Sequence, residues 1–529
     1  GIICWATLLA MGYVPEEVDK RLEKLLPIGM RLQLKNGINN CSVIDDSYSL
    51  DLSSLAIALD FLKQQKQHLR RTLILSDIPG PESEEVYEQV KHMIENKSVD
   101  RLIGVGEVIS RYGADFPCDT EFFTDTENLI ENFRSLKFGN ETILLKGARA
   151  FGFEAISHLL TQKVHETVLE INLNALEHNL NYYKAQLEPG IKIMAMVKAF
   201  SYGSGSYEIA NLLEFNKVDY LAVAYADEGV SLRKAGISMP IMVMSPDEMA
   251  FEAIIENKLE PEIYSLRILK EFIEFLNRKN LENYPVHIKL DTGMHRLGFM
   301  ENEVDEMLEL LAGTTRLHIQ SVFSHLVASE DPMHDDFTRK QIDLFARLSD
   351  QIRSMFTYPI IRHLDNTSGI SRWPEAFFDM VRLGIGLYGI DLSFGSDSPL
   401  QTVTSLKTTI SQIKQIPAGD TIGYNRAGKM PNGGMIATVK IGYADGYNTE
   451  LGNGVGKMLL GNKEVPTIGV ICMDMCMIDI TGINAAEGDE VFVFNDVIRV
   501  QDIAKQMNRT PYEVLTGISQ RVKRIYYYE

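Results

Sequence analysis

The fold of the central part of the chain follows from one stretch of sequence, Ile193-Met194-Ala195-Met196-Val197-Lys198-Ala199-Phe200-Ser201-Tyr202-Gly203. It opens with five apolar residues in a row, whereas a half-exposed strand alternates apolar and polar residues. A continuous apolar run of this length indicates a strand that is buried on both faces. The sequence therefore predicts a buried strand with Lys198 at its carboxyl end.

Similar apolar runs recur on the carboxyl side of this strand, at residues 220–224, 241–244, 286–290 and 319–323. Helix-periodic segments separate them, so the strands are expected to be parallel and covered by helices. From about residue 168 to Gly389 the pattern predicts a (β/α)8 barrel, a fold that carries its chemistry at the carboxyl ends of the strands. Lys198 stands at such an end.

The two flanking regions have different textures. Residues 41–160 alternate short apolar runs with charged helical segments, at 52–67 and 84–96, which predicts a parallel α/β unit. After Gly389, short β-rich segments are broken by Gly, Pro and Asn. We therefore expect an α/β protein of three domains: an α/β domain at 1–165, the barrel at 166–392 and a β domain at 393–529.

Composition narrows the class of protein. The 529 residues carry a net charge of -20, which disfavours a nucleic acid or an anionic membrane as partner. The five cysteines are scattered and form neither a disulfide framework nor a metal-binding pattern, and no stretch approaches the roughly 20 apolar residues of a membrane span. We expect a cytoplasmic enzyme that acts on a small molecule without a metal. The apolar residues 1–13 predict a buried helix, and the opening Gly suggests that the natural beginning is missing.

A lysine that is desolvated at a strand end can have a lowered pKa and form a Schiff base with an aldehyde. Taken alone, such a lysine is more often a surface residue that reaches out to water. The surrounding motif Val-Lys-Ala-x-x-Tyr-Gly at 197–203 resembles the cofactor-lysine signature of the alanine racemases, which use pyridoxal 5'-phosphate (PLP). The resemblance implies that Lys198 carries PLP and that Tyr202 contacts its phosphate.

The resemblance continues in order along the chain. Residues 287–298 match a segment in which Arg296 would face the cofactor's phenolate oxygen and the substrate. Lys289, which is carbamylated in many members of the family, would hold Arg296 in place. His325 would lie against the pyridine ring, although a lone histidine after a strand is more often a core residue. The other implied cofactor contacts are Asn366, Thr367, Ser368, Arg382, Gly384 and Ile385.

Arg382 bears on the choice of reaction. The resemblance places it at the pyridine nitrogen, and a guanidinium cannot accept a proton. It therefore disfavours a protonated ring, keeps the carbanion short-lived and favours reprotonation at Cα over transamination.

Three more matches lie in the β-rich region. Tyr424 matches the second catalytic base, Tyr443 a tyrosine at the substrate entry, and Met473 and Asp474 a loop that lines the site. A racemase needs one base on each face of Cα, and a phenol can serve if hydrogen bonds favour its anion. A single tyrosine is more often an exposed residue. The resemblance further implies a homodimer with shared sites, in which Tyr424 comes from the partner subunit, and D-alanine synthesis for peptidoglycan. A tyrosine beside the phosphate in some members is expected to be replaced by Gln520.

Residues 20–160 resemble the C-terminal part of the Mur ligase that adds D-alanyl-D-alanine to a cell-wall precursor. The motifs are Met-Arg-Leu at 30–32, Ile-Asp-Asp-Ser-Tyr-Ser at 44–49, Leu-Ser-Asp at 75–77 and Leu-Leu-Lys-Gly-Ala-Arg at 144–149. No Gly-Lys-Thr nucleotide loop precedes them, so we expect no ligase activity from this chain alone. A purely structural appendage is the alternative.

Alternatives remain for the whole chain. One alternative is a serine or broad-specificity racemase. Another is a different barrel-fold PLP enzyme such as a decarboxylase, although Tyr424 and Arg382 count against a decarboxylase. From a different class, the chain could be a non-catalytic scaffold. The sequence leaves open the choice between alanine and serine and the carbamylation of Lys289.

Overall fold

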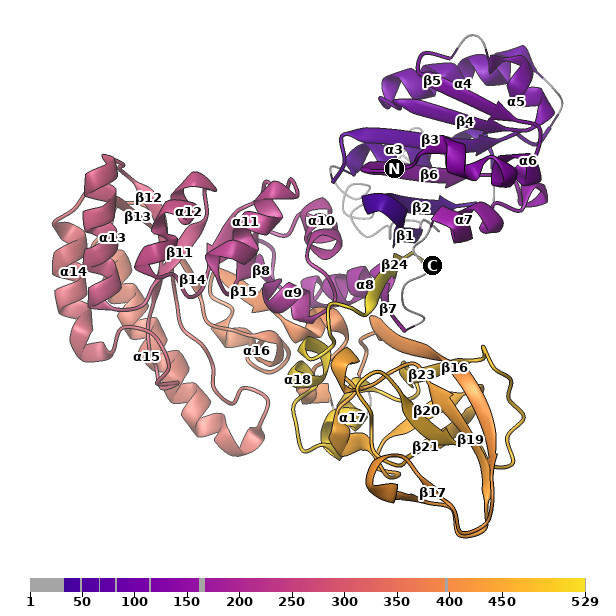
Figure 1. Ribbon diagram of the computed structural model, residues 1–529. Helices are drawn as coiled ribbons and strands as arrows, with labels where there is room; N and C mark the ends of the chain where they lie inside the picture. Colours follow the sequence, from indigo (N-terminus) through magenta and orange to yellow (C-terminus); the bar gives the residue numbers. More distant parts are fainter. Residues whose placement is uncertain are drawn as a thin grey trace, which may run out of the picture.

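The computed structural model describes residues 33–47, 50–65, 67–80, 83–113, 116–160, 167–394 and 398–528. Figure 1 shows an α/β domain, a barrel and a β-rich domain. The predicted helix at 1–13, the motif at 30–32, Tyr48, Ser49 and most of the predicted linker lie outside the described residues.

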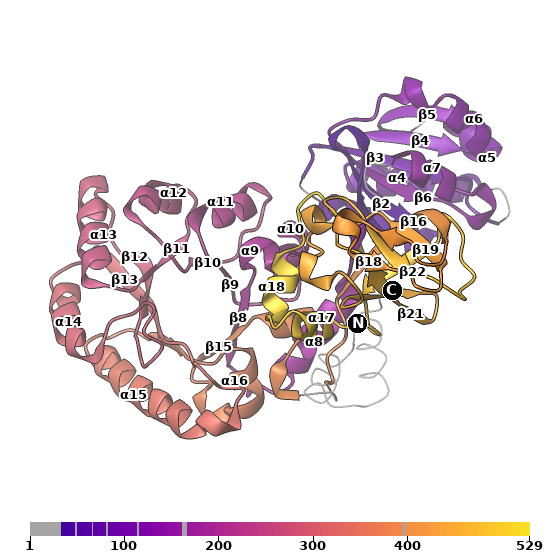
Figure 2. The same ribbon diagram turned by 60° about the horizontal axis from the view of Figure 1, so that its bottom comes forward.

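Eight parallel strands close into a barrel in the order β10-β11-β12-β13-β14-β15-β8-β9. Helices surround it, as the turned view in Figure 2 shows, so the predicted fold class is confirmed. The strands are β8 (Lys192–Met196), β9 (Tyr220–Val223), β10 (Ile241–Val243), β11 (Glu260–Ile263), β12 (Tyr284–Lys289), β13 (Leu317–Phe323), β14 (Ile361–His363) and β15 (Met380–Leu383). The surrounding helices are α8 (Leu173–Lys184), α10 (Tyr207–Phe215), α11 (Ala226–Lys234), α12 (Phe251–Glu256), α13 (Leu266–Lys279), α14 (Val304–Ala312), α15 (Asp335–Ser354) and α16 (Thr367–Arg372).

Three barrel strands were not among the predicted apolar runs. These are β11, β14 and β15, and each carries a buried ionisable residue: Glu262, His363 and Arg382, respectively. Buried polar groups need partners, and the barrel interior supplies partners for His363 and Arg382 from neighbouring strands, as described below.

The β-rich domain is built around the long strand β16 (Thr404–Ile416). It pairs with β7 (Val168–Asn172), β19 (Gly434–Val439) and β23 (Glu490–Phe494), and β20 (Lys457–Leu460), β21 (Lys463–Ile468) and β22 (Cys476–Asp479) complete this part of the sheet. The small hairpin of β17 (Thr421–Ile422) and β18 (Gly428–Lys429) carries Tyr424. Two helices follow, α17 (Val500–Gln506) and α18 (Pro511–Thr516), and α18 packs against the segment that contains Lys198.

In the N-terminal α/β domain, the parallel strands lie in the order β2-β6-β3-β4-β5. They are β2 (Ser42–Asp46), β3 (Arg70–Ser76), β4 (Arg101–Val105), β5 (Asp119–Phe123) and β6 (Glu141–Lys146), with α3 (Leu52–Gln64), α4 (Glu84–Asn96), α5 (Glu107–Arg111), α6 (Thr126–Glu131) and α7 (Glu154–Leu160). Two apolar clusters form its core, one holding residues of α3 and α4 and the other residues of α6 and α7.

One strand joins this domain to the rest of the chain. The last strand, β24 (Lys523–Tyr527), pairs in parallel with β7 and in antiparallel fashion with β1 (Gln33–Asn36), where Leu34 lies opposite Tyr526. In Figure 1, β24 lies between β7 and β1 of the N-terminal α/β domain. The following residue, Tyr528, packs edge-on against Phe61 of α3, with ring centroids 6.2 Å apart. Within the described part of the chain, no helix is both long and apolar enough to cross a membrane.

Candidate active site

Lys198 opens a turn of unusual handedness after β8. The next four residues, Ala199 to Tyr202, have φ angles of 52°, 56°, 48° and 53°, and Gly203 follows at 83°. L-residues pay about 1–2 kcal/mol each for the left-handed conformation, so this turn must be held in place by its surroundings. The first and last residues of this turn, Lys198 and Tyr202, line the same cavity.

This cavity has a volume of about 290 Å³. The residues that line it come mainly from the carboxyl ends of barrel strands, and they include every predicted cofactor contact. They are Met196, Lys198, Tyr202, Met244, Met294, Arg296, His325, Leu326, Val327, Glu330, Asn366, Thr367, Ser368, Arg382, Gly384, Ile385, Leu392 and Tyr512.

Burial favours the neutral form of two groups of the cavity. It lowers the pKa of Lys198, and the nearby charge of Arg296 lowers it further. Burial also holds the pKa of His325 well below its usual range, helped by the charge of Arg382. A larger fraction of Lys198 is therefore neutral, and able to accept a proton, than of a surface lysine, and His325 is neutral at pH 7.

Arg382 is fixed by a dense set of hydrogen bonds. Nη2 donates to the carbonyls of Ser324 (2.6 Å) and Leu364 (2.8 Å) and meets His325 Nδ1 at 3.3 Å, while Nη1 lies 3.0 Å from His363 Nδ1. Burial lowers the pKa of this guanidinium to about 10, so it remains charged at neutral pH.

A chain of polar groups crosses the barrel behind Arg382. His363 Nε2 meets Ser321 Oγ at 2.8 Å, Ser321 Oγ meets His287 Nδ1 at 2.6 Å, and His287 Nε2 meets Glu260 Oε2 at 2.9 Å. All three inner residues are fully buried. This series of hydrogen bonds was not predicted; its only signal in the sequence is the polar residues within otherwise strand-like segments.

Lys289 lies beneath the cavity and pairs with Glu262, Nζ to Oε1 at 3.5 Å. Both side chains are buried, and burial lowers the pKa of Lys289 and raises that of Glu262 to about 7. The predicted partner of Lys289 was Arg296; Glu262 was not predicted, because the segment Glu-Pro-Glu-Ile at 260–263 does not have the apolar pattern of a buried strand.

The lining residues fit PLP. Lys198 supplies an amine for the aldehyde, and Tyr202, Thr367 and Ser368 supply hydroxyls for the phosphate. Gly384 leaves the space between these groups open, because a Cβ there would lie 3.1 Å from the Tyr202 hydroxyl. The cavity also holds His325, an imidazole, and Arg382, a cation.

The expectation for Gln520 was wrong. Gln520 lies outside this cavity and lines another, behind the turn that follows Lys198. The tyrosine that lines the cofactor cavity beside Tyr202 is Tyr512, at the start of α18, and its ring centroid lies 5.8 Å from that of Tyr202. Sequence reasoning missed it because α18 was not predicted.

The predicted site residues of the β-rich domain do not line this cavity, but they lie near one another. Tyr443 N donates to the carbonyl of Cys472, which precedes Met473, and Gly423, next to Tyr424, packs near Val470. Tyr424, Tyr443 and Met473 are 69%, 45% and 54% exposed. Asp474 pairs with Arg521 at 2.9 Å.

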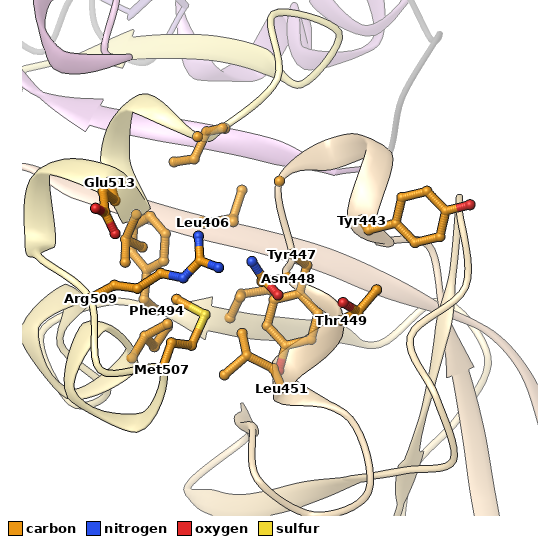
Figure 3. A pocket seen from close by; sticks show the side chains of 16 residues that line it. Leu406, Tyr443, Tyr447, Asn448, Thr449, Leu451, Phe494, Met507, Arg509 and Glu513 are labelled. Atoms are coloured by element: carbon orange, nitrogen blue, oxygen red, sulfur yellow. The ribbon is translucent and has the colours of Figure 1, made fainter. Parts of the chain in front are cut away.

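Tyr443 borders a second cavity, of about 410 Å³, within the β-rich domain. In Figure 3 its ring points away from Arg509 and Phe494 of that cavity. The exposed group Tyr424, Tyr443 and Met473 therefore faces outward, separate from Lys198.

A lysine that ends a barrel strand, in a cavity with hydroxyls at one end and a buried arginine at the other, defines a barrel-fold PLP enzyme. Family models for the alanine racemase N-terminal and C-terminal domains match residues 171–391 and 403–526. The chain belongs to the alanine racemase family of PLP-dependent isomerases.

Individual relatives agree. Alanine racemase 2 of Caldanaerobacter subterraneus subsp. tengcongensis is 36% identical over 383 residues, which cover 69% of this chain and 96% of the relative. The solved alanine racemase of Clostridium difficile 630 is 37% identical, with a TM-score of 0.65 over 69% of this chain and 96% of that one. The alanine racemase from Bartonella henselae, solved with covalently bound pyridoxal phosphate, is 27% identical, with a TM-score of 0.63 over 68% and 99% of the two chains.

Proposed function

We propose that this protein interconverts L- and D-alanine with two bases, Lys198 and Tyr424, at a site shared by two copies of the chain. One observation carries the proposal: Lys198 lines the cofactor cavity, whereas Tyr424 is 69% exposed and outside it. A second copy that docks its exposed tyrosine over the cavity would complete the site. The D-alanine formed would supply peptidoglycan synthesis.

When bound, PLP holds the substrate through its amino group and withdraws electrons from Cα, which acidifies the Cα proton. Lys198 exchanges a proton with Cα on one face, the D face by resemblance, and its lowered pKa suits this task. Tyr424 of the second copy exchanges a proton on the L face. Arg296 binds the substrate, with Met473 of the second copy lining the same space.

Arg382 and His325 support the tyrosine. Since Arg382 donates to His325 Nδ1, the histidine proton resides on Nε2, where it can donate to the tyrosine oxygen and favour its anion. Arg382 has no lone pair with which to accept a proton, so it would leave the pyridine nitrogen unprotonated. Its backbone hydrogen bonds fix this geometry.

The substrate assignment rests on the relatives. The alanine racemase from Bacillus anthracis, solved with bound L-Ala-P, is 29% identical, with a TM-score of 0.65. The test is to incubate the full chain and PLP with L-alanine or L-serine in D2O and to separate the enantiomers by chiral chromatography. We expect D-alanine with deuterium at Cα and none from Lys198→Ala. Faster conversion of serine would contradict the alanine assignment.

For the remaining regions, we propose that residues 1–165 are the C-terminal domain of a Mur ligase, ahead of a barrel at 166–392 and a β domain at 393–529. In support, the motifs at 45–47, 75–77 and 144–149 meet where β2, β3 and β6 end, the edge at which parallel α/β sheets bind ligands. Lys146 Nζ lies 2.6 Å from Asp46 Oδ2, and Ala148 N donates to Ser76 Oγ at 2.8 Å.

Calorimetric titration of the full chain with ADP and with D-alanyl-D-alanine tests this assignment. Binding that Lys146→Gln weakens would support a Mur-type site. The absence of binding by either ligand would favour a structural appendage.

A further inference from the structure

The left-handed turn after Lys198 is held at both ends by charged side chains that the proposed mechanism does not use, one half-buried (Glu228) and one buried (Arg524). We infer that Glu228 and Arg524 are positioning residues, which clamp this turn and thereby set the place of Lys198 and Tyr202 in the cavity. The inference rests on the proposed role of Lys198 as the cofactor lysine and base.

Glu228 holds the start of the turn. Its Oε1 accepts a hydrogen bond from Ala199 N at 2.6 Å, and its Oε2 accepts from Ala224 N at 2.7 Å and Tyr225 N at 3.2 Å. One carboxylate thus ties the residue after Lys198 to the end of the neighbouring strand β9. A neutral amide has a single acceptor oxygen and cannot make the same three bonds at this strength.

Arg524 holds the end of the turn. It is 5% exposed, and its Nε donates to the carbonyl of Gly203 at 2.9 Å. The two Nη atoms donate to carbonyls of the segment before β24, and the guanidinium carbon lies 5.5 Å from the ring centroid of Phe200, within the turn. Those carbonyls belong to Ile518 at 2.9 Å, Ser519 at 2.6 Å and Val522 at 2.6 Å.

A lysine cannot replace this fork, because its ammonium is a point donor with three protons, whereas the planar guanidinium reaches carbonyls on two sides at once. Arg524 therefore links the turn to the chain segment that leads from α18 into β24. The same strand pairs with β1, so the clamp also lies at the junction with the N-terminal domain.

The strain in the turn makes such a clamp necessary. Four consecutive non-glycine residues in the left-handed region would relax toward ordinary conformations if their contacts were removed. The next loop has no room to adjust, because a Cβ at Gly205 would overlap the hydroxyl of Tyr526 on β24. Any relaxation would therefore move the backbone that carries Lys198 and Tyr202, and a misplacement of about 1 Å can cost about 100-fold in rate.

The experiment compares Glu228→Gln and Arg524→Lys with the parent chain, each as full-length protein loaded with PLP. Matched controls are Asp227→Asn, an acid at the same helix end, and Lys523→Gln, the neighbour on β24. We expect kcat for alanine to fall about 10- to 100-fold in the two clamp variants, with KM changed less than about threefold. The pH midpoint of the visible band of the lysine-bound cofactor should shift in these variants and stay unchanged in the controls.

Amide exchange followed by mass spectrometry separates a local from a global effect. Peptides covering 199–205 should exchange faster in the clamp variants, while peptides from β12 and β13 should match the parent. Parent-like kcat, midpoint and exchange in both variants would overturn the clamp, as would faster exchange spread evenly over the barrel. A parent chain that neither racemises alanine nor shows the band would instead overturn the proposed function.

Discussion

Arg382 Nη2 and His325 Nδ1 lie 3.3 Å apart at the floor of the cofactor cavity, and the arginine is the donor. This contact fixes the histidine as an acceptor at Nδ1 and places a permanent cation beside it. Through its other nitrogen, Nη1, Arg382 also joins the cavity to the hydrogen-bonded series His363, Ser321, His287 and Glu260 that crosses the barrel. The protonation state of His325 and the charge beside it therefore depend on buried polar residues of the barrel strands.

Replacing Arg382 should change the reaction as well as its rate. In Arg382→Glu or Arg382→Lys, a protonated pyridine would spread the Cα charge over the ring for longer, so racemisation should fall and transamination should rise. We expect the pyruvate formed per racemisation turnover to increase about tenfold or more. Coupled pyruvate assay and chiral chromatography on the same sample measure both, with Arg362→Gln on the adjacent strand as control. An unchanged product ratio would mean that Arg382 does not contact the ring nitrogen.

Lys198 should be indispensable. Lys198→Ala removes the amine that forms the bond to the cofactor aldehyde and, in the proposed mechanism, one of the two bases, so the visible band of the bound cofactor and racemisation should vanish together. Lys192→Ala, at the other end of the same strand, should keep both. Absorption spectra and alanine racemisation rates of the two purified variants decide the matter. A Lys198→Ala protein that keeps the band would assign the cofactor to another lysine.

Much of this site could be predicted because its motifs are local. The five strands with unbroken apolar runs lie where the sequence indicated, Lys198 follows the end of β8, and the nine residues predicted to contact the cofactor line one cavity. The strands β11, β14 and β15 could not be found in this way. Their polar residues Glu262, His363 and Arg382 interrupt the apolar pattern, and the partners that make them tolerable come from distant segments.

The backbone conformation of the turn after Lys198 could not be predicted from the neighbouring sequence either. Left-handed conformations are normally signalled by Gly or Asn, yet Ala-Phe-Ser-Tyr adopts one here. Its conformation is imposed by Glu228 and Arg524, and no window of sequence around Lys198 contains Arg524. Tyr512 was missed for a related reason, since only the packing of α18 against this turn brings it into the cavity.

The buried histidines should make the barrel sensitive to acid. Burial and the charge of Arg382 hold the pKa values of His325 and His363 well below the ordinary 6.5. Below pH 6.5 these histidines bind protons in the unfolded chain but not in the folded barrel. Their contribution to the free energy of unfolding is therefore fully present above pH 6.5 and is lost as the pH falls toward their folded-state pKa values. Each histidine can contribute up to about 1.4 kcal/mol per pH unit to this loss.

His363→Gln tests this dependence, because it removes one of these protons while an amide can still bond to Ser321 and Arg382. Urea unfolding between pH 4.5 and 7.5 should show a shallower loss of stability in the variant. Trp5→Phe in both proteins leaves Trp373, which is buried in the barrel, as the fluorescent reporter. Carboxylates elsewhere affect both proteins equally, so identical slopes would show that His363 takes up a proton in the folded state.

Tyr424 and Lys198 are expected to act together only across a subunit boundary, which makes a numerical forecast possible. Lys198→Ala and Tyr424→Ala chains should each be inactive, because each lacks one base at every site. When the two are dissociated, mixed in equal amounts and reassociated, about half of the dimers are mixed, and each mixed dimer holds one site with both bases and one with neither. Activity should therefore recover to about a quarter of the parent value. Native mass spectrometry counts the mixed dimers. The control is a mixture of Tyr443→Ala and Tyr424→Ala chains. Both changes lie in the β-rich domain, which one copy contributes to each site, so every site of a mixed dimer still lacks one of the two tyrosines. If mixed dimers form and no activity returns, both bases belong to the same chain and the shared-site proposal is wrong.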